Sequence, residues 1–276
     1  MSGVDSPYND LDRPPLDAAA LNRALTGDDS GWREVLVVAE TASTNTALAR
    51  RARDGAPAGL VLVAEHQTGG RGRLDRAWTS PPRSGLTVSV LLEPIGVRPE
   101  HWPWIPLLAG VAVVEGVRRS AGVDATLKWP NDVLVGDRKL AGILSERVET
   151  VDRSLAVVGV GLNVTLRSDE LPVPEATSLL LEQARTTDRT VVLREILRVL
   201  DRLFAGWVGH GGDPAVGLAE SYARRCSTLG RAVRVALPAG GTLVGDAVRV
   251  DPHGRLVVRT AAAEEVVGAG DVLHVR

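Results

Sequence analysis

Lysine is almost absent from this sequence. Its 276 residues include 32 basic ones, and all of these are arginines except Lys128 and Lys139. Arginine presents a planar fork of donors, whereas lysine presents a compact point charge on a flexible stem, so a site built for lysine can refuse arginine. Because arginine fills the ordinary cationic positions here, the two surviving lysines are candidate functional residues.

Cysteine and long apolar runs are scarce as well. With Cys226 as its only cysteine, the chain forms no intrachain disulfide and no cysteine-based zinc site. It has no apolar run of the roughly 18 residues that a membrane helix needs. It also lacks a basic start followed by an apolar segment, which would indicate secretion. The sequence therefore predicts a cytoplasmic protein with no membrane contact.

Neither sign of charge dominates the composition. The formal net charge is -2, with 44% apolar and 24% charged residues, which is ordinary for a globular protein. Such a chain has no overall positive field that would attract polyanions. We therefore expect no nucleic-acid partner.

Residue patterns divide the chain into three regions. Residues 1–30 are rich in Asp, Pro and small residues, and we expect a loose N-terminal arm with one short helix over 16–25. Residues 31–225 alternate short β-like runs with helical patterns, which predicts an α+β domain with a buried mixed sheet. Residues 226–276 are typical of a small antiparallel β-barrel. Within the second region we expect helices over 43–53, 102–120, 192–207 and 214–225.

A segment rich in glycine and arginine, QTGGRGRLDRAW, occupies Gln67–Trp78. Gly70 and Gly72 permit backbone geometries that other residues resist, and they let a ligand approach closely. Donors for carboxylate or phosphate oxygens come from Arg71, Arg73 and Arg76. The pattern predicts a loop that closes over an anion, and a solvated basic loop is the plain alternative. It is not a dinucleotide-binding G-x-G-x-x-G motif, because Asp75 stands in place of the third glycine.

Both lysines lie in a second segment. Lys128 opens KWPND, and Lys139 follows a short turn and opens KLAGIL. We expect one hairpin whose first strand carries Lys128 and Asp132 and whose second strand carries Lys139. A cation, the Asn131 amide and a carboxylate would then lie close together. The alternative is an ordinary Pro-Asn-Asp turn, but it does not explain why only these positions kept lysine.

Two further segments contain polar residues that are rare in this chain. GVGLN ends a buried strand at Asn163, with glycines that let a flat ligand press on the backbone. Ser43 and Thr44 begin a predicted helix, where their hydroxyl groups either cap the helix or bind a polar head group. Four of the chain's few side-chain amides lie in these segments: Asn45, Gln67, Asn131 and Asn163.

In this order, STN, QTGGRGRLDRAW, KWPND, RKLAGIL and GVGLN resemble the motifs of bacterial biotin protein ligases. The resemblance covers residues 34–276, and the pairing of GRGR with KWPND is highly specific. It implies an α+β fold related to class II aminoacyl-tRNA synthetases and lipoate ligases, followed by a small SH3-like barrel. The implied division is a biotin- and ATP-binding catalytic domain over 31–225 and the barrel over 226–276.

The resemblance also implies a two-step reaction. Biotin and MgATP give biotinyl-5′-AMP and pyrophosphate, and a specific lysine of a biotin carboxyl carrier protein then takes the biotinyl group as an amide. The first step brings a carboxylate to an anionic phosphate, so positive charge must be placed there. Mg²⁺ would arrive with ATP, and we expect no metal cage made by the protein. The implied catalytic residues are Lys139, Arg73, Asp132 and Lys128.

Binding residues are carried over from the resemblance in the same way. The implied biotin-binding residues are Ser43, Thr44, Asn45, Gln67, Gly70, Arg71, Gly72, Arg73, Lys139 and Gly142. The implied ATP- and adenylate-binding residues are Arg71, Arg73, Arg76, Trp78, Lys128, Asn131, Lys139 and Asn163. Lys139 resembles the lysine that contacts both the biotin carboxylate and the α-phosphate. Asp132 resembles the residue that meets the acceptor lysine in the second step.

The chain departs from the family pattern in two places. It shows no winged helix-turn-helix segment at its start, so we expect a monofunctional enzyme without operator binding. It has no aromatic residue around 176–180, where the family often packs the adenine. Two alternatives are a lipoate-protein ligase of the same fold and a non-catalytic biotin-binding regulator. GRGR with KWPND disfavours the first, and Lys139 and Asp132 have no clear use in the second. A monomer and a ligand-induced homodimer both remain open.

Overall fold

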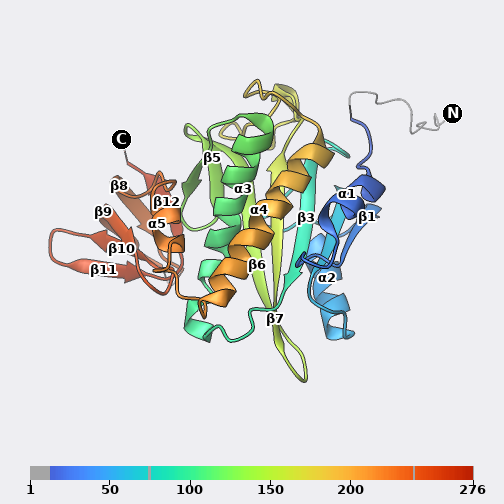
Figure 1. Cartoon of the computed structure of the whole chain (residues 1–276). Coiled ribbons are helices and arrows are strands. Elements are labelled where there is room, and N and C mark those ends of the chain that lie inside the picture. The colour runs from blue at the N-terminus through green and yellow to red at the C-terminus, as the bar shows by residue number, and fades with distance from the viewer. Residues whose placement is uncertain (1–12, 74–75, 239, 276) are drawn as a thin grey trace.

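The computed structural model describes residues 13–73, 76–238 and 240–275. They form two sheets with helices packed on the larger one (Figure 1). The larger sheet has seven strands in the order β1-β2-β3-β7-β6-β5-β4, and only β1 and β2 pair in parallel. The second, named here the C-terminal sheet, has the order β11-β10-β9-β8-β12 and is antiparallel. The predicted α+β class with a mixed sheet is confirmed.

The strands of the larger sheet are β1 (Glu34–Thr41), β2 (Leu60–Gln67), β3 (Gly85–Leu92), β4 (Thr126–Lys128), β5 (Asp132–Val135), β6 (Arg138–Glu149) and β7 (Ser154–Asn163). Those of the C-terminal sheet are β8 (Ala232–Ala236), β9 (Thr242–Val250), β10 (Leu256–Arg259), β11 (Glu264–Val267) and β12 (Asp271–His274). The helices are α1 (Ala18–Leu25), α2 (Thr44–Arg53), α3 (Trp104–Ala121), α4 (Arg189–Gly209) and α5 (Leu218–Ala223). The last is shorter than the helix expected over 214–225.

Local sequence signals explain where the main helices begin and end. The Ser43 hydroxyl accepts a hydrogen bond from the Thr46 N–H and caps α2, as predicted. Asp188 caps α4 by accepting from two backbone N–H groups. Gly122 ends α3 in the left-handed region, at φ 71°, where glycine is favoured.

The larger sheet has a helix layer on each face. α3 and α4 lie side by side on one face (Figure 1), while α2 packs on the other. Alternate residues of β3 face these two layers: Val88 and Val90 belong to the core with α3 and α4, whereas Leu91 belongs to the core with Leu48 of α2. The α2 face is apolar only beneath that helix, which leaves the rest of the face for a site.

Residues 13–30 are not the loose arm that the sequence predicted. Leu21 and Leu25 of α1 are buried, because the helix packs against α4 and β1. The buried Arg13 guanidinium donates to the side chain and the carbonyl of Thr165 and pairs with Glu170. The helix expected over 16–25 is present as α1. The loose arm was wrong for these residues because their packing partners, such as Thr165 and Glu170, lie far away in the sequence. Residues 1–12 of the predicted arm lie outside the described residues.

The lysine segment forms two short strands, β4 and β5, and the start of the longer strand β6 rather than one hairpin. Lys128 ends β4, Asp132 begins β5, and Lys139 lies near the start of β6. The predicted hairpin is right for Asp132 and Lys139 and wrong for Lys128. Pro130 explains the difference, because proline has no backbone N–H to donate and interrupts a strand.

Packing between α3 and α4 depends on a glycine, and we expect Gly116→Ala to lower the free energy of unfolding by about 1–3 kcal/mol. A Cβ at Gly116 would lie 2.7 Å from the Ile196 Cα and 2.8 Å from its N, so the helix backbones would have to separate. Gly206→Ala is the matched control, because this exposed α4 glycine has no atom within 4 Å of an added Cβ. Denaturant unfolding checks both. Equal stability of the two variants would contradict the packing argument.

Candidate active site

Strand register brings the separate sequence motifs into one row. Gly161 of β7 pairs with Thr87 of β3 and with Gly142 of β6, and Gly142 also pairs with Asp132 of β5. Asp132 in turn pairs with Lys128 of β4. Directly paired residues place their side chains on the same face of a sheet. The GVGLN, KLAGIL and KWPND segments therefore meet on one line across the sheet.

Glycines make the floor of this site. A Cβ on Gly161 would lie 2.3 Å from Cε2 of the Trp78 indole, and a Cβ on Gly159 would lie 2.3 Å from Oδ1 of Asn45. Gly142 has Trp78 and the end of the Lys139 side chain above it, at 3.2–3.5 Å from an added Cβ. The side chains above the sheet thus rest directly on backbone.

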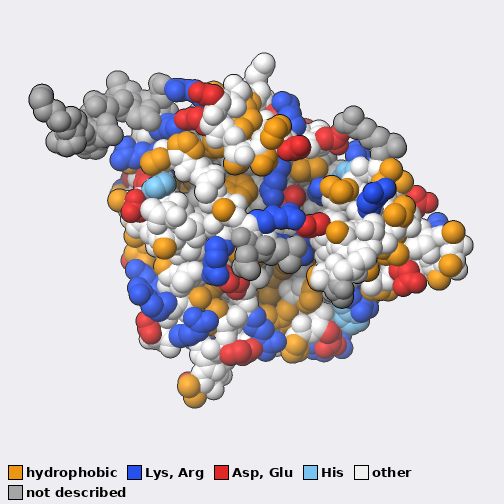
Figure 2. Space-filling model, turned by 180° about the vertical axis from the view of Figure 1, so that it is seen from behind, with side chains coloured by type: hydrophobic (Ala, Val, Ile, Leu, Met, Phe, Trp, Pro, Cys, Tyr) orange, Lys and Arg blue, Asp and Glu red, His pale blue; other side chains and the backbone are white. Residues whose placement is uncertain are grey.

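A cavity of about 590 Å³ lies above this floor. Seen from behind, the surface is hollowed between the larger sheet and the C-terminal sheet, with apolar side chains in the hollow and cationic ones beside it (Figure 2). The predicted site residues that line the cavity are Ser43, Thr44, Asn45, Gln67, Arg71, Gly72, Arg73, Arg76, Trp78, Lys128, Asn131, Asp132, Lys139, Gly142 and Asn163. Gly70 does not line it; an added Cβ there would lie 2.3 Å from the Trp78 carbonyl oxygen, so Gly70 serves close packing of the loop.

A network of hydroxyl and amide groups forms one end of the cavity. The Thr44 N–H donates to Gln67 Oε1 at 2.8 Å, and the Thr44 hydroxyl lies 3.0 Å from the same oxygen. The buried Ser89 hydroxyl contacts Thr44 Oγ1 and Asn45 Oδ1. Asn45 Nδ2 donates to Glu146 at 2.7 Å. This end presents fixed donors and acceptors that suit a neutral polar head group.

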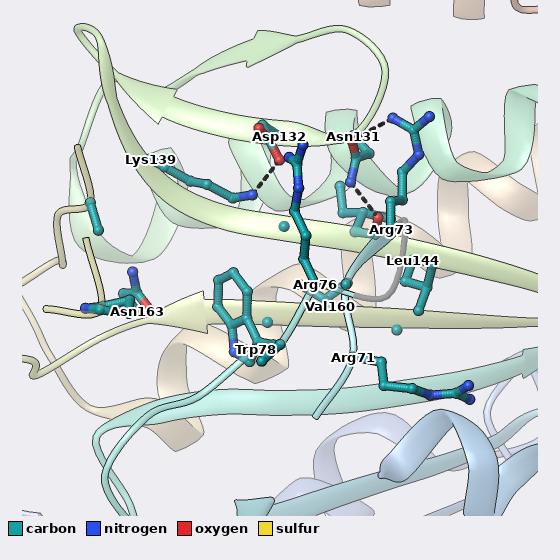
Figure 3. Close-up of a pocket in the computed structure, with 18 of the residues that line it drawn as sticks. Arg71, Arg73, Arg76, Trp78, Asn131, Asp132, Lys139, Leu144, Val160 and Asn163 are labelled. Carbon is teal, nitrogen blue, oxygen red and sulfur yellow. Dashed lines mark hydrogen bonds and ion pairs between the residues drawn. The ribbon is translucent and has the colours of Figure 1, made fainter. Parts of the chain in front are cut away.

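Lys139 and Asp132 form an ion pair at the middle of the site. The Lys139 Nζ lies 2.6 Å from Asp132 Oδ1, and both side chains are partly exposed (Figure 3). The backbone of Lys139 is also held, since its N–H donates to the Glu175 carbonyl and its carbonyl accepts from the Thr177 N–H. The base of the Lys139 side chain is therefore fixed by the backbone, and its ammonium is held by Asp132.

Each predicted loop arginine has a partner in the protein. Arg71 donates to Thr46 at 2.9 Å and lies 3.5 Å from Glu146, near the hydroxyl and amide end. Arg73 donates to the Asn131 amide oxygen at 3.2 Å, and Arg76 pairs with Asp271 of β12. Arg71 is therefore held against α2, and Arg76 is held against the C-terminal sheet.

Arg73 carries positive charge at a desolvated position. Burial is the main cause that lowers the pKa of its guanidinium, and Asp271 and Asp132 oppose this effect. Arginine stays protonated in proteins, so its charge acts in a medium that screens it less than water does.

Lys128 lies where the larger sheet meets the C-terminal sheet. Burial lowers the pKa of His274 of β12, and the charges of Lys128 and Arg231 lower it further. His274 Nε2 is 3.1 Å from the Thr228 hydroxyl. Lys128 is thus part of a cationic border of the cavity, at a different position from Lys139.

The side chains of two predicted asparagines form hydrogen bonds to backbone carbonyls. Asn131 Nδ2 donates to the Ile143 carbonyl, and its Oδ1 accepts from Arg73. Asn163 Nδ2 donates to the Thr177 carbonyl at 2.9 Å, which holds the segment after η3 (Ser168–Glu170). Both residues line the cavity while their side chains fix neighbouring backbone.

Sequence reasoning missed Ser89, Glu146 and Asp271. Ser89 had a signal, because Thr87 and Ser89 are the two hydroxyl residues of an otherwise apolar strand and lie two residues apart on one face. Glu146 and Asp271 had none, since each acts through a partner that is distant in the sequence.

Comparisons with known proteins agree with this geometry. Residues 37–163 match the Biotin/lipoate A/B protein ligase family, and residues 228–275 match the Biotin protein ligase C terminal domain. The chain is 43% identical to the biotin–acetyl-CoA-carboxylase ligase of Mycobacterium tuberculosis, over 96% of this chain and 97% of that protein. It is 35% identical to the bifunctional ligase/repressor BirA of Bacillus spizizenii, over 83% and 70% of the two chains.

A solved structure gives the same relationship. The biotin protein ligase of Aquifex aeolicus in complex with biotin and ATP superposes with a TM-score of 0.73 at 26% identity, over 89% of this chain and all of that one. These matches and the mixed sheet with its C-terminal sheet show that the chain belongs to the biotin protein ligase family.

Proposed function

We propose that this chain is an ATP-dependent biotin ligase that forms biotinyl-5′-AMP and then transfers biotin to a lysine of a carboxyl carrier protein. The observation that carries the proposal is one cavity in which the Lys139–Asp132 pair lies between a hydroxyl and amide end and a cationic border. The similarity to the mycobacterial ligase, which extends over nearly all of both chains, supports the same activity.

Biotin fits the hydroxyl and amide end of the cavity. Its ureido head is neutral and has both donors and acceptors, which match the side chains of Ser43, Asn45 and Gln67. Gly142 of the floor and the neighbouring Leu144 side chain line an apolar slot for the ring and the tail. In this pose the carboxylate of the tail points toward the middle of the cavity.

The first step needs positive charge where two anions meet. A carboxylate oxygen of biotin attacks the α-phosphorus of ATP, the bond to the bridging oxygen breaks, and pyrophosphate leaves. Lys139, whose ammonium can move between neighbouring oxygens, would contact both anions, and Arg73 would stabilise the charge that develops on the phosphoryl oxygens. Lys128 lies farther along the cationic border and would contact the departing phosphates.

Mg²⁺ enters this scheme as part of the substrate MgATP. In the described ranges, no group of three or more His, Cys, Asp or Glu side chains is arranged to hold a metal ion. The donor set therefore fits an ion bound chiefly by the phosphates of ATP. The metal would neutralise part of the triphosphate charge.

The second step is assigned to Asp132. The acceptor amine attacks the carbonyl carbon of the mixed anhydride, AMP leaves, and the amine nitrogen loses a proton as the amide forms. Asp132 lies partly exposed at the cavity and already binds an ammonium group, that of Lys139. A carboxylate that accepts from an ammonium can orient the acceptor lysine and take up its proton.

The acceptor in this proposal is a biotin carboxyl carrier protein or carboxylase domain, and nucleic acid has no role. We place the reaction in the cytoplasm, where ATP is supplied. In the part of the chain that the structure describes, no helix has the length and apolarity to cross a membrane. The proposal accommodates a monomer or a homodimer that forms when the adenylate binds.

The proposed activity predicts that the protein, incubated with MgATP, labelled biotin and an acceptor domain, places the label on the acceptor lysine. Labelled lipoate in a parallel incubation is the control for the related ligase. Mass spectrometry of the acceptor reads both. Transfer from lipoate alone, or none from biotin, would rule out the proposed function.

Lys139→Arg should lower the rate of biotin-dependent pyrophosphate release by about a hundredfold, the scale expected for a displaced charge-stabilising donor. The charge is kept, but a planar guanidinium does not fit the contact between Asp132 and the Gly142 backbone. Arg138→Lys, at the exposed neighbouring position, is the matched control and should leave the rate unchanged. A near-normal rate in Lys139→Arg would refute the point-charge argument.

Asp132→Asn should separate the two steps. The amide keeps the shape of the side chain but cannot take up a proton, so transfer from preformed biotinyl-5′-AMP to the acceptor should slow by about a hundredfold. Pyrophosphate release in a single turnover should change much less. Asp124→Asn, at an exposed position outside the cavity lining, is the control. Equal losses in both steps would count against this role for Asp132.

A further inference from the structure

The first residue that the structure describes, Arg13, is buried, with 7% of its surface exposed. Its Nε donates to the Thr165 hydroxyl at 3.1 Å, and its Nη2 donates to the Thr165 carbonyl at 2.9 Å. The guanidinium also pairs with Glu170. Burial of a charge is costly unless partners of this kind receive it. Arg13 therefore ties the N-terminal region to a segment 152–157 positions farther along the chain.

The backbone that carries Arg13 is itself fixed to the larger sheet and its helices. The Pro14 carbonyl accepts from Arg189 of α4 at 2.6 Å, and the Leu16 N–H donates to Glu65 of β2 at 2.7 Å. Arg189 and Glu65 form a buried ion pair with each other. The guanidinium of Arg13 thus extends from a rigid base and holds its partners in a defined place.

One of these partners, Glu170, lies in the loop 167–176, which follows β7. Its carboxylate accepts from the Arg167 N–H at 2.9 Å, and this contact closes the single turn η3. The hydrogen bond from Arg13 is the main cause that lowers the pKa of the Glu170 carboxyl, so the pair stays charged at neutral pH. Arg13 therefore attaches the turn of this loop to the rigid base.

The same loop forms part of the cavity wall. Pro172 and Ala176 line the cavity, two and six positions after Glu170. Next to Ala176, the Glu175 carbonyl accepts from the Lys139 N–H at 2.6 Å. The loop thus runs from the turn that the buried guanidinium holds to the backbone of the residue assigned to the α-phosphate.

The biotin end of the cavity is built from other elements. There the Thr44 N–H of α2 donates to Gln67 of β2, and the Ser89 hydroxyl of β3 contacts the Thr44 hydroxyl. Figure 3 shows Asn163, which precedes the loop, and Arg71, which lies near the biotin end, at opposite ends of the pocket. A displaced loop should therefore affect ATP more than biotin.

We infer that Arg13 is a positioning residue for the ATP-dependent first step. It keeps the loop 167–176 at the cavity wall, and the loop in that place completes the part of the site that contains Lys139 and Asn163. This inference rests on the proposed function, in which those two residues contact the nucleotide. Arg13 itself lies outside the cavity lining, so its effect passes through Glu170 and the loop.

Arg13→Ala should raise the KM for ATP in biotin-dependent pyrophosphate release by about three- to tenfold and leave the KM for biotin unchanged. A loop that is in place for about a third to a tenth of the time lowers the apparent affinity by the same factor. Arg13→Lys keeps a cation opposite Glu170 and should recover part of the loss. Arg23→Ala, at an exposed arginine of α1, is the matched control and should match the wild type.

Glu170→Gln tests the same contact from the side of the loop. It should also raise the KM for ATP, whereas Asp169→Asn, at the exposed neighbouring position, should not. Because both changes act on one contact, the double variant of Arg13→Ala and Glu170→Gln should show no larger rise than Arg13→Ala alone. Hydrogen exchange read by mass spectrometry should show faster exchange of the amides of the loop 167–176 in each of these variants.

The outcomes distinguish the inference from the function beneath it. Wild-type protein that releases no pyrophosphate with biotin and ATP overturns the proposed function and the inference together. Active wild-type protein overturns the inference alone if Arg13→Ala and Glu170→Gln leave the KM for ATP unchanged, or if they raise the KM for biotin equally. If Arg13→Ala does not fold, Glu170→Gln decides by the same criteria. A rise confined to ATP, with faster exchange in the loop, supports the inference.

Discussion

A floor of bare backbone is the constraint on which the rest of the site depends. Gly142 and Gly161 are paired neighbours on β6 and β7, and Gly159 lies two residues along β7. Because these positions have no side chains, the Trp78 indole and the Asn45 amide can lie in contact with the sheet. Beneath α2 the same face of these strands carries leucine and valine, and the helix packs on those side chains. Where the same strands carry glycine instead, the missing side-chain volume leaves room for the cavity.

Helices α3 and α4 hold the strands that carry this floor, because they pack on the opposite face of the sheet. α3 is buried along most of its length against the sheet and α4. The Arg189–Glu65 ion pair, with N and O 2.6 Å apart and both side chains at least nine-tenths buried, joins α4 to β2 two residues before Gln67. Arg189 also donates to the carbonyls of Pro14 and Gly85. A buried ion pair adds little net stability, but an arrangement that separates its partners leaves a buried charge without a partner and is strongly destabilised. The pair therefore fixes the end of β2, where the segment with the loop arginines leaves the sheet.

Local signals in the sequence predicted local features well. The Ser43 cap, the hairpin of Asp132 and Lys139, and the glycines of GVGLN are each defined by residues a few positions apart, and each lies where the pattern indicated. Failures came where distant partners decide the outcome. Arg13 is buried because Thr165 and Glu170 receive it, and Arg76 is held by Asp271 from a different sheet. No pattern near Arg13 or Arg76 specifies these pairings, because they exist only once the strands are in register.

The two retained lysines lie in different physical settings. The stem of Lys139 crosses Gly142, and its ammonium meets Asp132 within 2.6 Å, so a longer planar group would collide with the floor or lose the carboxylate. The charge of Lys128 lowers the pKa of His274 in the C-terminal sheet, so the contribution of Lys128 there is its charge. Nothing in the structure explains why that position kept lysine rather than arginine. The composition therefore pointed to the right region of the molecule, and only for Lys139 does packing against the glycine floor give a geometric reason to expect that arginine cannot replace it.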